Sequence, residues 1–253
     1  MNKNIKTKHK VNRLLQLGAA ILVIALFVVG LAATAQPAQA AGVVTDCTKY
    51  GPGPGTLQEA LVGGGTVTFN CSGTIIVPEI TINDNTVISA AGQDVTLSGN
   101  NANRVFLVAN GKVLDLQNIT LANGKTSGDG GGIKVEREGV LGLNNVVVRD
   151  NVADINGGGI AFFSRNELRI TNSTFLRNTS NDRFEGGGAI YYRPWGFSTF
   201  PLTIQGSTFS ENVSSGVNTA SGGAITLETE SELNGSVLTV NISNSTFSGN
   251  AAR

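Results

Sequence analysis

The stretch STFLRNTSNDRFEGGGAI, from Ser173 to Ile190, contains the two short motifs that decide how this chain folds. The first motif is Phe-x-x-Asn, at Phe175 and Asn178, and the second is Gly-Gly-Ala-Ile, which ends at Ile190. A glycine run before apolar residues is compatible with a phosphate-binding loop, a flexible linker or one unit of a repeat. The spacing of both motifs along the whole chain discriminates between these readings.

The Phe-x-x-Asn motif belongs to a series of five aligned segments. The aligned apolar residues are Leu121, Val148, Phe175, Phe209 and Phe247. The residues three positions later are Gly124, Asn151, Asn178, Asn212 and Asn250. Successive apolar positions are 27, 27, 34 and 38 residues apart, so the segments recur with a variable insertion rather than at random.

The glycine motif alternates with this series without a break. Its isoleucines are Ile133, Ile160, Ile190 and Ile225, and the closest matches to the motif contain the glycine pairs Gly187, Gly188 and Gly222, Gly223. Random glycine clusters would not stay in phase with a second motif through four cycles. We therefore interpret the glycine run as one part of a repeat.

A third apolar alternation lies between the two motifs and begins at Leu141, Leu168, Leu202 and Leu238. Each repeat thus offers three period-2 strands of three to five residues, and no repeat contains a plausible helix of ten or more residues. We expect an all-β fold, a single-stranded right-handed parallel β-helix (a solenoid), in which each coil pairs with the coils before and after it.

The motif residues suit that geometry. The apolar residues should stack inward on their equivalents, and the asparagines should form a ladder of amides and tolerate a left-handed backbone at the corners. The glycine pairs should allow positive φ where a Cβ atom would clash.

The ends of the chain predict three segments. Residues 1–40 have a basic start, an apolar run and Ala38-Gln39-Ala40, which indicates a cleaved signal peptide, with an uncleaved membrane anchor as the alternative. Residues 41–65 should form an N-terminal cap with a short helix, because Thr56 and Glu59 make a capping box. Residues 66–253 should hold the repeats, and the series ends as if truncated.

Removal of the signal peptide leaves 13 of the 18 basic residues beside 18 acids, a net charge of −5, and no histidine. This balance argues against nucleic acid as a partner. It also removes the commonest general base. Cys47 and Cys71 are the two cysteines of an exported chain, so we expect one disulfide.

The alternating motifs resemble the repeats of the chlamydial polymorphic outer membrane proteins and of related bacterial surface proteins. The match is literal in two glycine motifs, at Ile190 and Ile225, and in three Phe-x-x-Asn motifs, at Phe175, Phe209 and Phe247. The segment around the capping box is similar to the cap of large secreted bacterial β-helix proteins, and together the resemblances cover residues 56–250. They imply a secreted or surface-exposed passenger, often an adhesin, which the chlamydial proteins join to a membrane-anchoring domain.

The aromatic segment IYYRPWGFSTFP, Ile190–Pro201, lengthens its repeat and is the candidate contact surface for a sugar or protein. Its candidate ligand contacts are Tyr191, Tyr192, Arg193, Trp195 and Phe197. The alternative is that these aromatic residues only pack against the outside of the solenoid. No cofactor is expected, and Gly128-Asp129-Gly130 gives only a weak indication of Ca²⁺.

Polysaccharide lyases and pectin hydrolases share the expected fold, so an enzyme of that type is the alternative function. Such hydrolases need paired carboxylates across a cleft. The notable acids, Asp129, Asp150, Asp154, Glu228, Glu230 and Glu232, fall in predicted turns or loops, where we expect them to be solvated. We therefore expect a non-catalytic passenger with an adhesion or envelope-structural role, located outside the cell or on the cell surface, including an outer membrane. Its partners would be a host or neighbouring cell surface, a glycan or an envelope component, with membrane contact only through the signal peptide or a missing C-terminal anchor.

Overall fold

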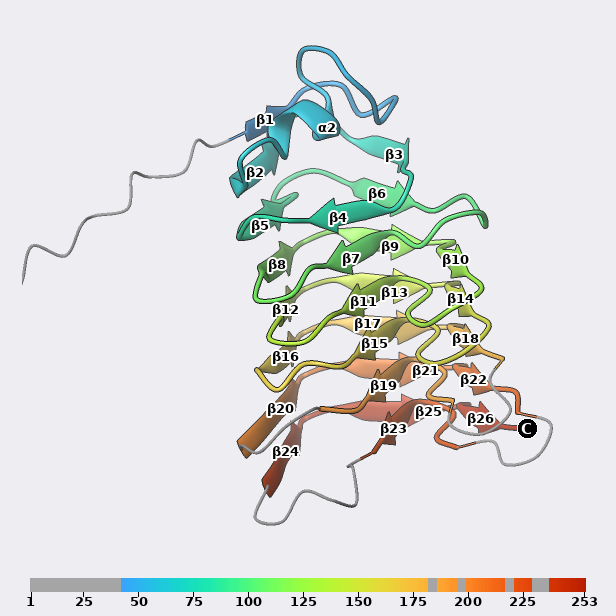
Figure 1. The fold of residues 1–253 in the computed structure, drawn as a ribbon. Helices are drawn as coiled ribbons and strands as arrows, with labels where there is room; N and C mark the ends of the chain where they lie inside the picture. The colour runs from blue at the N-terminus through green and yellow to red at the C-terminus, as the bar shows by residue number, and fades with distance from the viewer. Residues whose placement is uncertain (1–41, 182–185, 195–198, 217–220, 229–236) are drawn as a thin grey trace, which may run out of the picture. The chain divides into compact units, whose positions relative to one another are not determined.

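The computed structural model describes residues 42–181, 186–194, 199–216, 221–228 and 237–253. The described chain forms short strands and a four-residue helix, α2 (Leu57–Ala60). The strands assemble into four all-parallel sheets, which we call sheets A to D (Figure 1). The expectation of an all-β fold with parallel strands is confirmed.

The two longest series of strands form sheets A and B. Sheet A contains, in spatial order, β1 (Gly42–Val44), β2 (Gly65–Phe69), β5 (Thr86–Ser89), β8 (Val113–Gln117), β12 (Val140–Asn144), β16 (Leu168–Thr171), β20 (Thr199–Gln205) and β24 (Val237–Ser243). Sheet B contains β3 (Gly73–Ile76), β6 (Val95–Ser98), β9 (Thr120–Ala122), β13 (Val147–Arg149), β17 (Thr174–Leu176), β21 (Thr208–Ser210) and β25 (Thr246–Ser248).

Sheets C and D consist of shorter strands. Sheet C contains β4 (Ile80–Ile82), β7 (Phe106–Val108), β11 (Ile133–Val135), β15 (Ile160–Phe162), β19 (Ile190–Tyr192) and β23 (Ile225–Leu227). Sheet D contains the two-residue strands β10 (Lys125–Thr126), β14 (Val152–Ala153), β18 (Thr179–Ser180), β22 (Val213–Ser214) and β26 (Ala251–Ala252).

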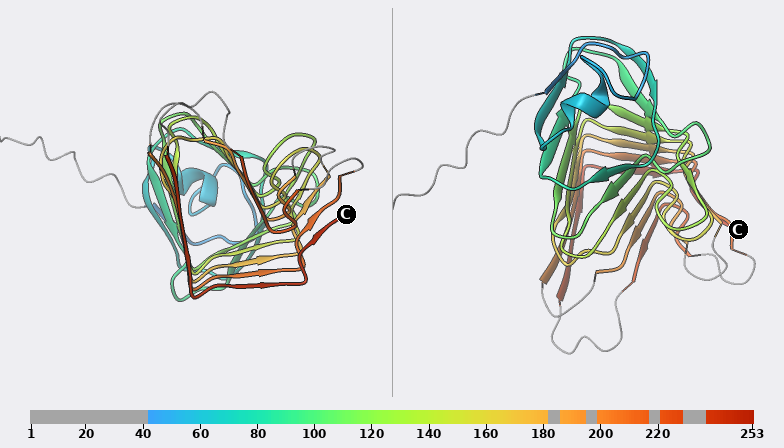
Figure 2. Two further views of the ribbon diagram at one scale, coloured as in Figure 1. Left: turned by 90° about the horizontal axis from the view of Figure 1, so that it is seen from below. Right: turned by 45° about the horizontal axis from the view of Figure 1, so that its top comes forward.

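From β8 onward the chain visits the sheets in a fixed order. From β8 in sheet A it passes to β9 in sheet B, β10 in sheet D and β11 in sheet C, and then returns to sheet A at β12, directly beside β8. The equivalent strands of successive repeats lie over one another when viewed along the stack (Figure 2).

The predicted register of the repeat is confirmed in sheets B and C. Phe175 pairs with Val148 on one side and Phe209 on the other, and Ile190 pairs with Ile160 and Ile225. The Phe175 and Phe209 rings stack with centroids 4.7 Å apart, and Phe209 and Phe247 stack at 4.8 Å. These spacings equal the separation of neighbouring strands, so the core is a set of side-chain columns that follow the backbone pairing.

From β8 onward the number of strands per repeat differs from the prediction of three, whereas the earlier turns β2–β4 and β5–β7 have three strands each, as predicted. Sheet D adds a fourth strand directly after each ladder position, as at Val152 and Thr179. Two-residue strands leave no room for a period-2 alternation, so the hydrophobic pattern could not reveal them.

One predicted alignment in sheet A is wrong by two residues. Leu202 pairs with Val240, whereas Leu238 pairs with Phe200. The alternation from Leu238 to Ile242 offers two overlapping registers that place the same side chains inward. In the observed register, each paired residue lies seven positions before the phenylalanine of the following sheet B strand: Leu202 before Phe209, and Val240 before Phe247.

The asparagine ladder is present, with side-chain amides bonded from one repeat to the next. The Asn151 Nδ2 atom donates to the Asn178 Oδ1 atom at 2.9 Å, Asn178 donates to Asn212 at 2.9 Å, and Asn212 donates to Asn250 at 2.8 Å. Backbone N–H groups of the same residues donate to the same oxygen atoms. Asn151, Asn178 and Asn212 are fully buried.

The expectation that the ladder asparagines also adopt the left-handed backbone is wrong. The residue before each ladder position takes that conformation, at Asn123, Asp150, Arg177 and Glu211. A second left-handed corner precedes the sheet B strands at Asn118, Asn145, Asn172 and Asn244. Ladder bonding and corner formation are therefore divided between neighbouring residues.

The glycine motif forms a tight corner at its first glycine. Gly187 has φ +78°, and a Cβ atom there would lie 2.4 Å from the Ile190 carbonyl oxygen. Gly222 repeats this geometry before Ile225. The predicted need for glycine is confirmed at both positions.

The N-terminal segment joins a strand, a helix and a disulfide. Thr56 caps α2: its Oγ1 atom accepts a hydrogen bond from the Glu59 N–H group, and the Glu59 carboxylate accepts one from the Gly55 N–H group. Leu57 and Ala60 on this helix are buried. Cys47 and Cys71 form a disulfide with their Cα atoms 5.8 Å apart. The segment predicted as a cap also supplies β1, which pairs with β2 as the first strand of sheet A.

Candidate functional site

The aromatic segment starts on strand β19, whose side chains alternate between the core and the outer face of sheet C. Tyr192 lies in register with Phe162, and their rings stack with centroids 5.2 Å apart. Tyr191 lies in register with Ala161 on the opposite side of the strand. Both tyrosines are fully buried, which contradicts the prediction that their rings are exposed to a ligand.

Tyr192 is a core residue. Burial raises the pKa of its phenol well above the usual value, so the hydroxyl stays protonated at physiological pH. This hydroxyl has no hydrogen-bond partner among the described residues. Trp195 and Phe197, the other predicted aromatic contacts, lie outside the described residues.

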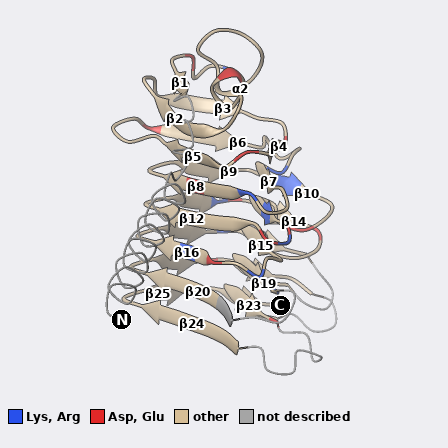
Figure 3. Ribbon diagram, turned by 60° about the vertical axis from the view of Figure 1, so that its left-hand side comes forward, with Lys and Arg blue, Asp and Glu red and all other residues tan. Residues whose placement is uncertain are grey.

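Arg193 remains at the surface and belongs to a group of side chains on the outer face of sheet C. We call this group the sheet C cluster: Lys134, Phe163, Tyr191, Arg193 and Glu228. Figure 3 shows Lys and Arg in blue and Asp and Glu in red near β15 and β19 of sheet C.

Neighbouring repeats bring the cluster together. The Tyr191 hydroxyl donates a hydrogen bond to the Glu228 carboxylate, and the Arg193 Nε atom lies 3.9 Å from the same carboxylate. The Phe163 ring meets Tyr191 edge-on with centroids 5.8 Å apart. The Lys134 Nζ atom lies 5.5 Å from the centre of the Phe163 ring.

The cluster remains accessible at its charged ends. The side chains of Lys134, Arg193 and Glu228 keep 24%, 29% and 34% of their surface exposed. Cations beside an aromatic ring and a carboxylate can bind a polar partner through hydrogen bonds and ring contacts. The cluster therefore provides a small mixed surface for recognition.

Sequence reasoning singled out Arg193 and Tyr191 for this surface but missed Lys134 and Phe163. It placed Glu228 among solvated acids, whereas the structure pairs it with Tyr191. The signal was present in the repeat: Phe163, Arg193 and Glu228 each stand three positions after the glycine-motif isoleucine.

The other predicted solvated acids also have partners where they are described. Asp150 accepts hydrogen bonds from Arg149 and Arg177, at 2.8 Å each. Partial burial alone would raise the pKa of Asp150, but the hydrogen bonds and charges of Arg177 and Arg149 lower it below its usual value. Asp154 accepts a hydrogen bond from Asn181 at 3.2 Å, and Glu230 and Glu232 lie outside the described residues.

The calcium indication at Gly128-Asp129-Gly130 gains no support from the local geometry. The Asp129 carboxylate lies 3.8 Å from the Lys134 Nζ atom and accepts from the Asn156 N–H group. Within the described ranges, no three His, Cys, Asp or Glu side chains gather as a metal-binding group. None of the helices in those ranges is long and apolar enough to span a membrane.

Comparison with known proteins gives no match: no family model, no curated protein and no solved structure is significantly similar to this chain.

Proposed function

We propose that this chain is a non-catalytic, secreted or cell-surface passenger with an adhesion or envelope-structural role. We further propose that it is a single-stranded right-handed parallel β-helix with repeats of the chlamydial polymorphic outer membrane protein type. The order in which the chain visits sheets A, B, D and C supports winding by one coil per repeat.

One observation carries the proposal: the repeated motif residues contact one another and thereby hold the repeats together. The asparagines bond to each other, the phenylalanines stack on each other, and the first glycine of each motif turns a corner. Motif residues of this kind serve a scaffold rather than a reaction. The partner would then contact side chains that vary between repeats, as in the sheet C cluster.

The alternative function, a polysaccharide lyase or hydrolase, requires carboxylates that are available to substrate. Asp150 is held by two arginines, and Glu228 is bonded to a tyrosine and lies near an arginine. These contacts favour structural roles for both acids.

Two assays on the intact protein test the proposal. Incubation with polygalacturonate and alginate, with and without Ca²⁺, should release no sugar fragments, and the protein should bind intact cells or envelope preparations saturably. Release of unsaturated or shortened sugars would establish the enzyme instead. Absence of binding to any cell or envelope preparation would remove the adhesion role.

Variants of the sheet C cluster locate the contact surface. Arg193→Ala should weaken cell binding about five-fold, because it removes a partly exposed cation beside Glu228. Arg165→Ala is the matched control: its side chain is 52% exposed and pairs with Glu138, outside the cluster. Equal binding by both variants would exclude the cluster as the contact surface.

A further inference from the structure

Sheet B has two columns of residues that alternate with the inward positions. One column is mixed and includes Ile76, Arg149 and Leu176. The other presents threonine in almost every repeat, and its positions from β3 to β25 are Thr74, Thr96, Thr120, Val147, Thr174, Thr208 and Thr246. We call this column the threonine row. The residue that follows each member points inward and is apolar, as Ile75 and Leu97 illustrate.

Strand propensity alone does not account for this uniformity. Threonine suits the solvent face of any strand. The outward column of sheet C nevertheless reads Leu107, Lys134, Ala161, Tyr191 and Thr226, and that of sheet A reads Val87, Asp115, Gly142, Arg169, Thr203 and Asn241. The second outward column of sheet A is polar but mixed, and reads Ser89, Gln117, Asn144, Thr171, Gln205 and Ser243. The same propensities act on all three sheets, yet none of these columns repeats a single residue type as the column of sheet B does.

The threonine hydroxyls are regularly spaced, and asparagine amides lie beside them. Adjacent strands place its hydroxyl groups about 4.8 Å apart. The corner residues beside it include Asn118 and Asn145, whose amides are hydrogen-bonded to each other at 2.8 Å. The row and these amides therefore offer uncharged donors and acceptors side by side.

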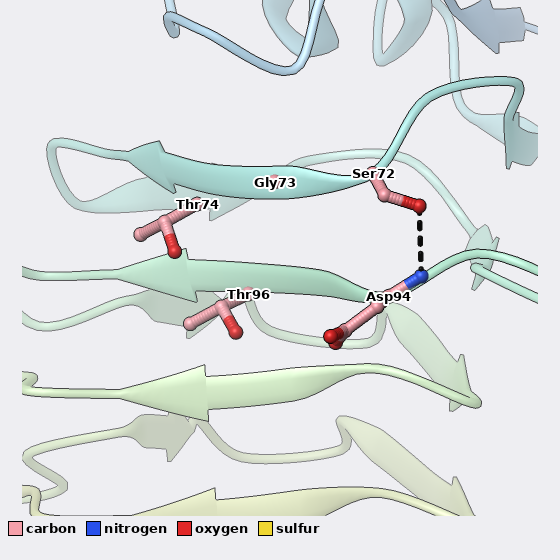
Figure 4. Close-up of a pocket in the computed structure, with 5 residues that line it drawn as sticks. All are labelled: Ser72, Gly73, Thr74, Asp94 and Thr96. Atoms are coloured by element: carbon pink, nitrogen blue, oxygen red, sulfur yellow. Dashed lines mark hydrogen bonds between the residues drawn. The ribbon is translucent and has the colours of Figure 1, made fainter.

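A pocket of about 310 Å³ opens at the N-terminal end of the row, lined by Ser72, Gly73, Thr74, Asp94 and Thr96. The Ser72 hydroxyl is already used, since it donates to Gln93 and accepts from the Asp94 N–H group. The Asp94 carboxylate is exposed and has no hydrogen bond or ion pair among the described residues. Figure 4 shows this carboxylate on the same face of β3 and β6 as the Thr74 and Thr96 side chains.

We propose that the threonine row and this pocket form a binding site for a linear, neutral polysaccharide that lies along the stack. Such a ligand is periodic and rich in hydroxyl groups, which match a periodic line of threonine hydroxyls. The pocket has the volume of a small ligand site. Its carboxylate accepts hydrogen bonds from sugar hydroxyls and disfavours an anionic chain. This site is distinct from the sheet C cluster and goes beyond the adhesion role proposed above.

Depletion of the intact protein from solution by microcrystalline cellulose, chitin and linear β-mannan tests the site, with polygalacturonate as the anionic comparison. We expect saturable binding to at least one neutral polymer that changes little between low and high salt, since the contacts are not ion pairs. Asp94→Asn combined with Thr96→Val and Thr120→Val should weaken this binding at least about ten-fold. Val147 shows that the row accommodates valine without loss of pairing.

Thr203→Val is the matched control, because it removes an outward hydroxyl from sheet A instead. It should bind as the unchanged protein does, and all variants should keep the same circular dichroism spectrum. Binding to none of the neutral polymers, or to polygalacturonate alone, would overturn the proposal. Equal binding by the row variant and the unchanged protein would also overturn it. None of these results bears on cell binding through Arg193, so the two proposals fail separately.

Discussion

At the scale of single residues, the stack depends on buried polar side chains that bond from repeat to repeat. The Asn178 Oδ1 atom accepts from both nitrogen atoms of Asn151, and its Nδ2 atom donates to Asn212 and to the Val148 carbonyl. Such a network is stabilising only when each member has its partners, since an unpaired buried polar group is costly.

Asn178→Ala should therefore lower the free energy of unfolding by about 2–4 kcal/mol, because it leaves buried donors of Asn151 unpaired. Denaturant unfolding followed by circular dichroism measures the change. Asn181→Ala, at an exposed position three residues away, should cost less than about 0.5 kcal/mol. A similar loss in both variants would show that the ladder contributes little.

The Asp150 carboxylate makes part of the stability dependent on pH. Its pKa is lowered in the folded chain despite partial burial, because Arg177 and Arg149 favour the charged form. Its contribution is therefore complete above the unfolded pKa, about 3.9, and is lost as the pH falls through the lower folded value.

Asp150→Asn should lower the melting temperature at pH 7, and its difference from the unchanged protein should shrink as the pH falls from about 5 to about 2. Asparagine keeps a residue that tolerates the left-handed corner, where φ is 57°. Asp154→Asn, which alters a carboxylate bonded to the neutral amide of Asn181, is the control. A difference that is constant with pH would contradict the assigned role of the two arginines.

At the scale of elements, the sequence predicted those strands that carry an apolar alternation and missed those that do not. Sheets B and C follow from Phe175 and Ile190 and their equivalents, whereas the strands of sheet D have two residues each. The sequence also did not predict the hydrogen bonds between repeats in which the Ser173 Oγ atom accepts from the Val146 N–H group and the Ser207 Oγ atom accepts from the Ser173 N–H group. Earlier repeats have Ile119 or Val146 at this position, so no serine pattern runs through the whole series.

The predicted contact surface was partly wrong, and the alignment of the repeats explains why. Tyr192 stands at the position of Val135 and Phe162, which are fully buried in a core column of sheet C. The aromatic residues and the extra length of this segment suggested a contact surface. Tyr192, however, stands two positions after the glycine-motif isoleucine, and residues at that position point into the core. The sheet C cluster depends on contacts between side chains of four successive repeats, which no single segment of the sequence displays.

The phenylalanine column of sheet B should stabilise each strand in proportion to the ring contacts it makes. Phe209 is fully buried between Phe175 and Phe247, so Phe209→Ala should cost about 3–5 kcal/mol. Phe247 has the same chemistry but is 44% exposed and has one described ring neighbour. Phe247→Ala should cost less than half as much in the same denaturant experiment, and equal costs would show that the column does not act through stacking.

At the scale of the whole molecule, the described chain is a series of repeats that each contact their neighbours through parallel pairing. In such an architecture, stability is close to a sum of repeat and interface terms, so one complete repeat can be removed if the register survives. One spacing recurs in these repeats: the ladder residue comes six positions after the left-handed residue that precedes the sheet B strand. Asn151 follows Asn145 by six positions, and Asn178 follows Asn172 by six positions.

Deletion of residues 148–174 removes one 27-residue period and joins Val147 to Phe175, which leaves that six-residue distance intact. We expect a folded protein with the same type of circular dichroism spectrum and a lower melting temperature. Deletion of residues 148–173 removes one residue fewer and lengthens the segment to seven, which moves Phe175 from the inward to the outward phase. This variant should lose cooperative unfolding or fail to fold. Equal behaviour of the two deletions would contradict a stack in which the corner-to-ladder spacing sets the register.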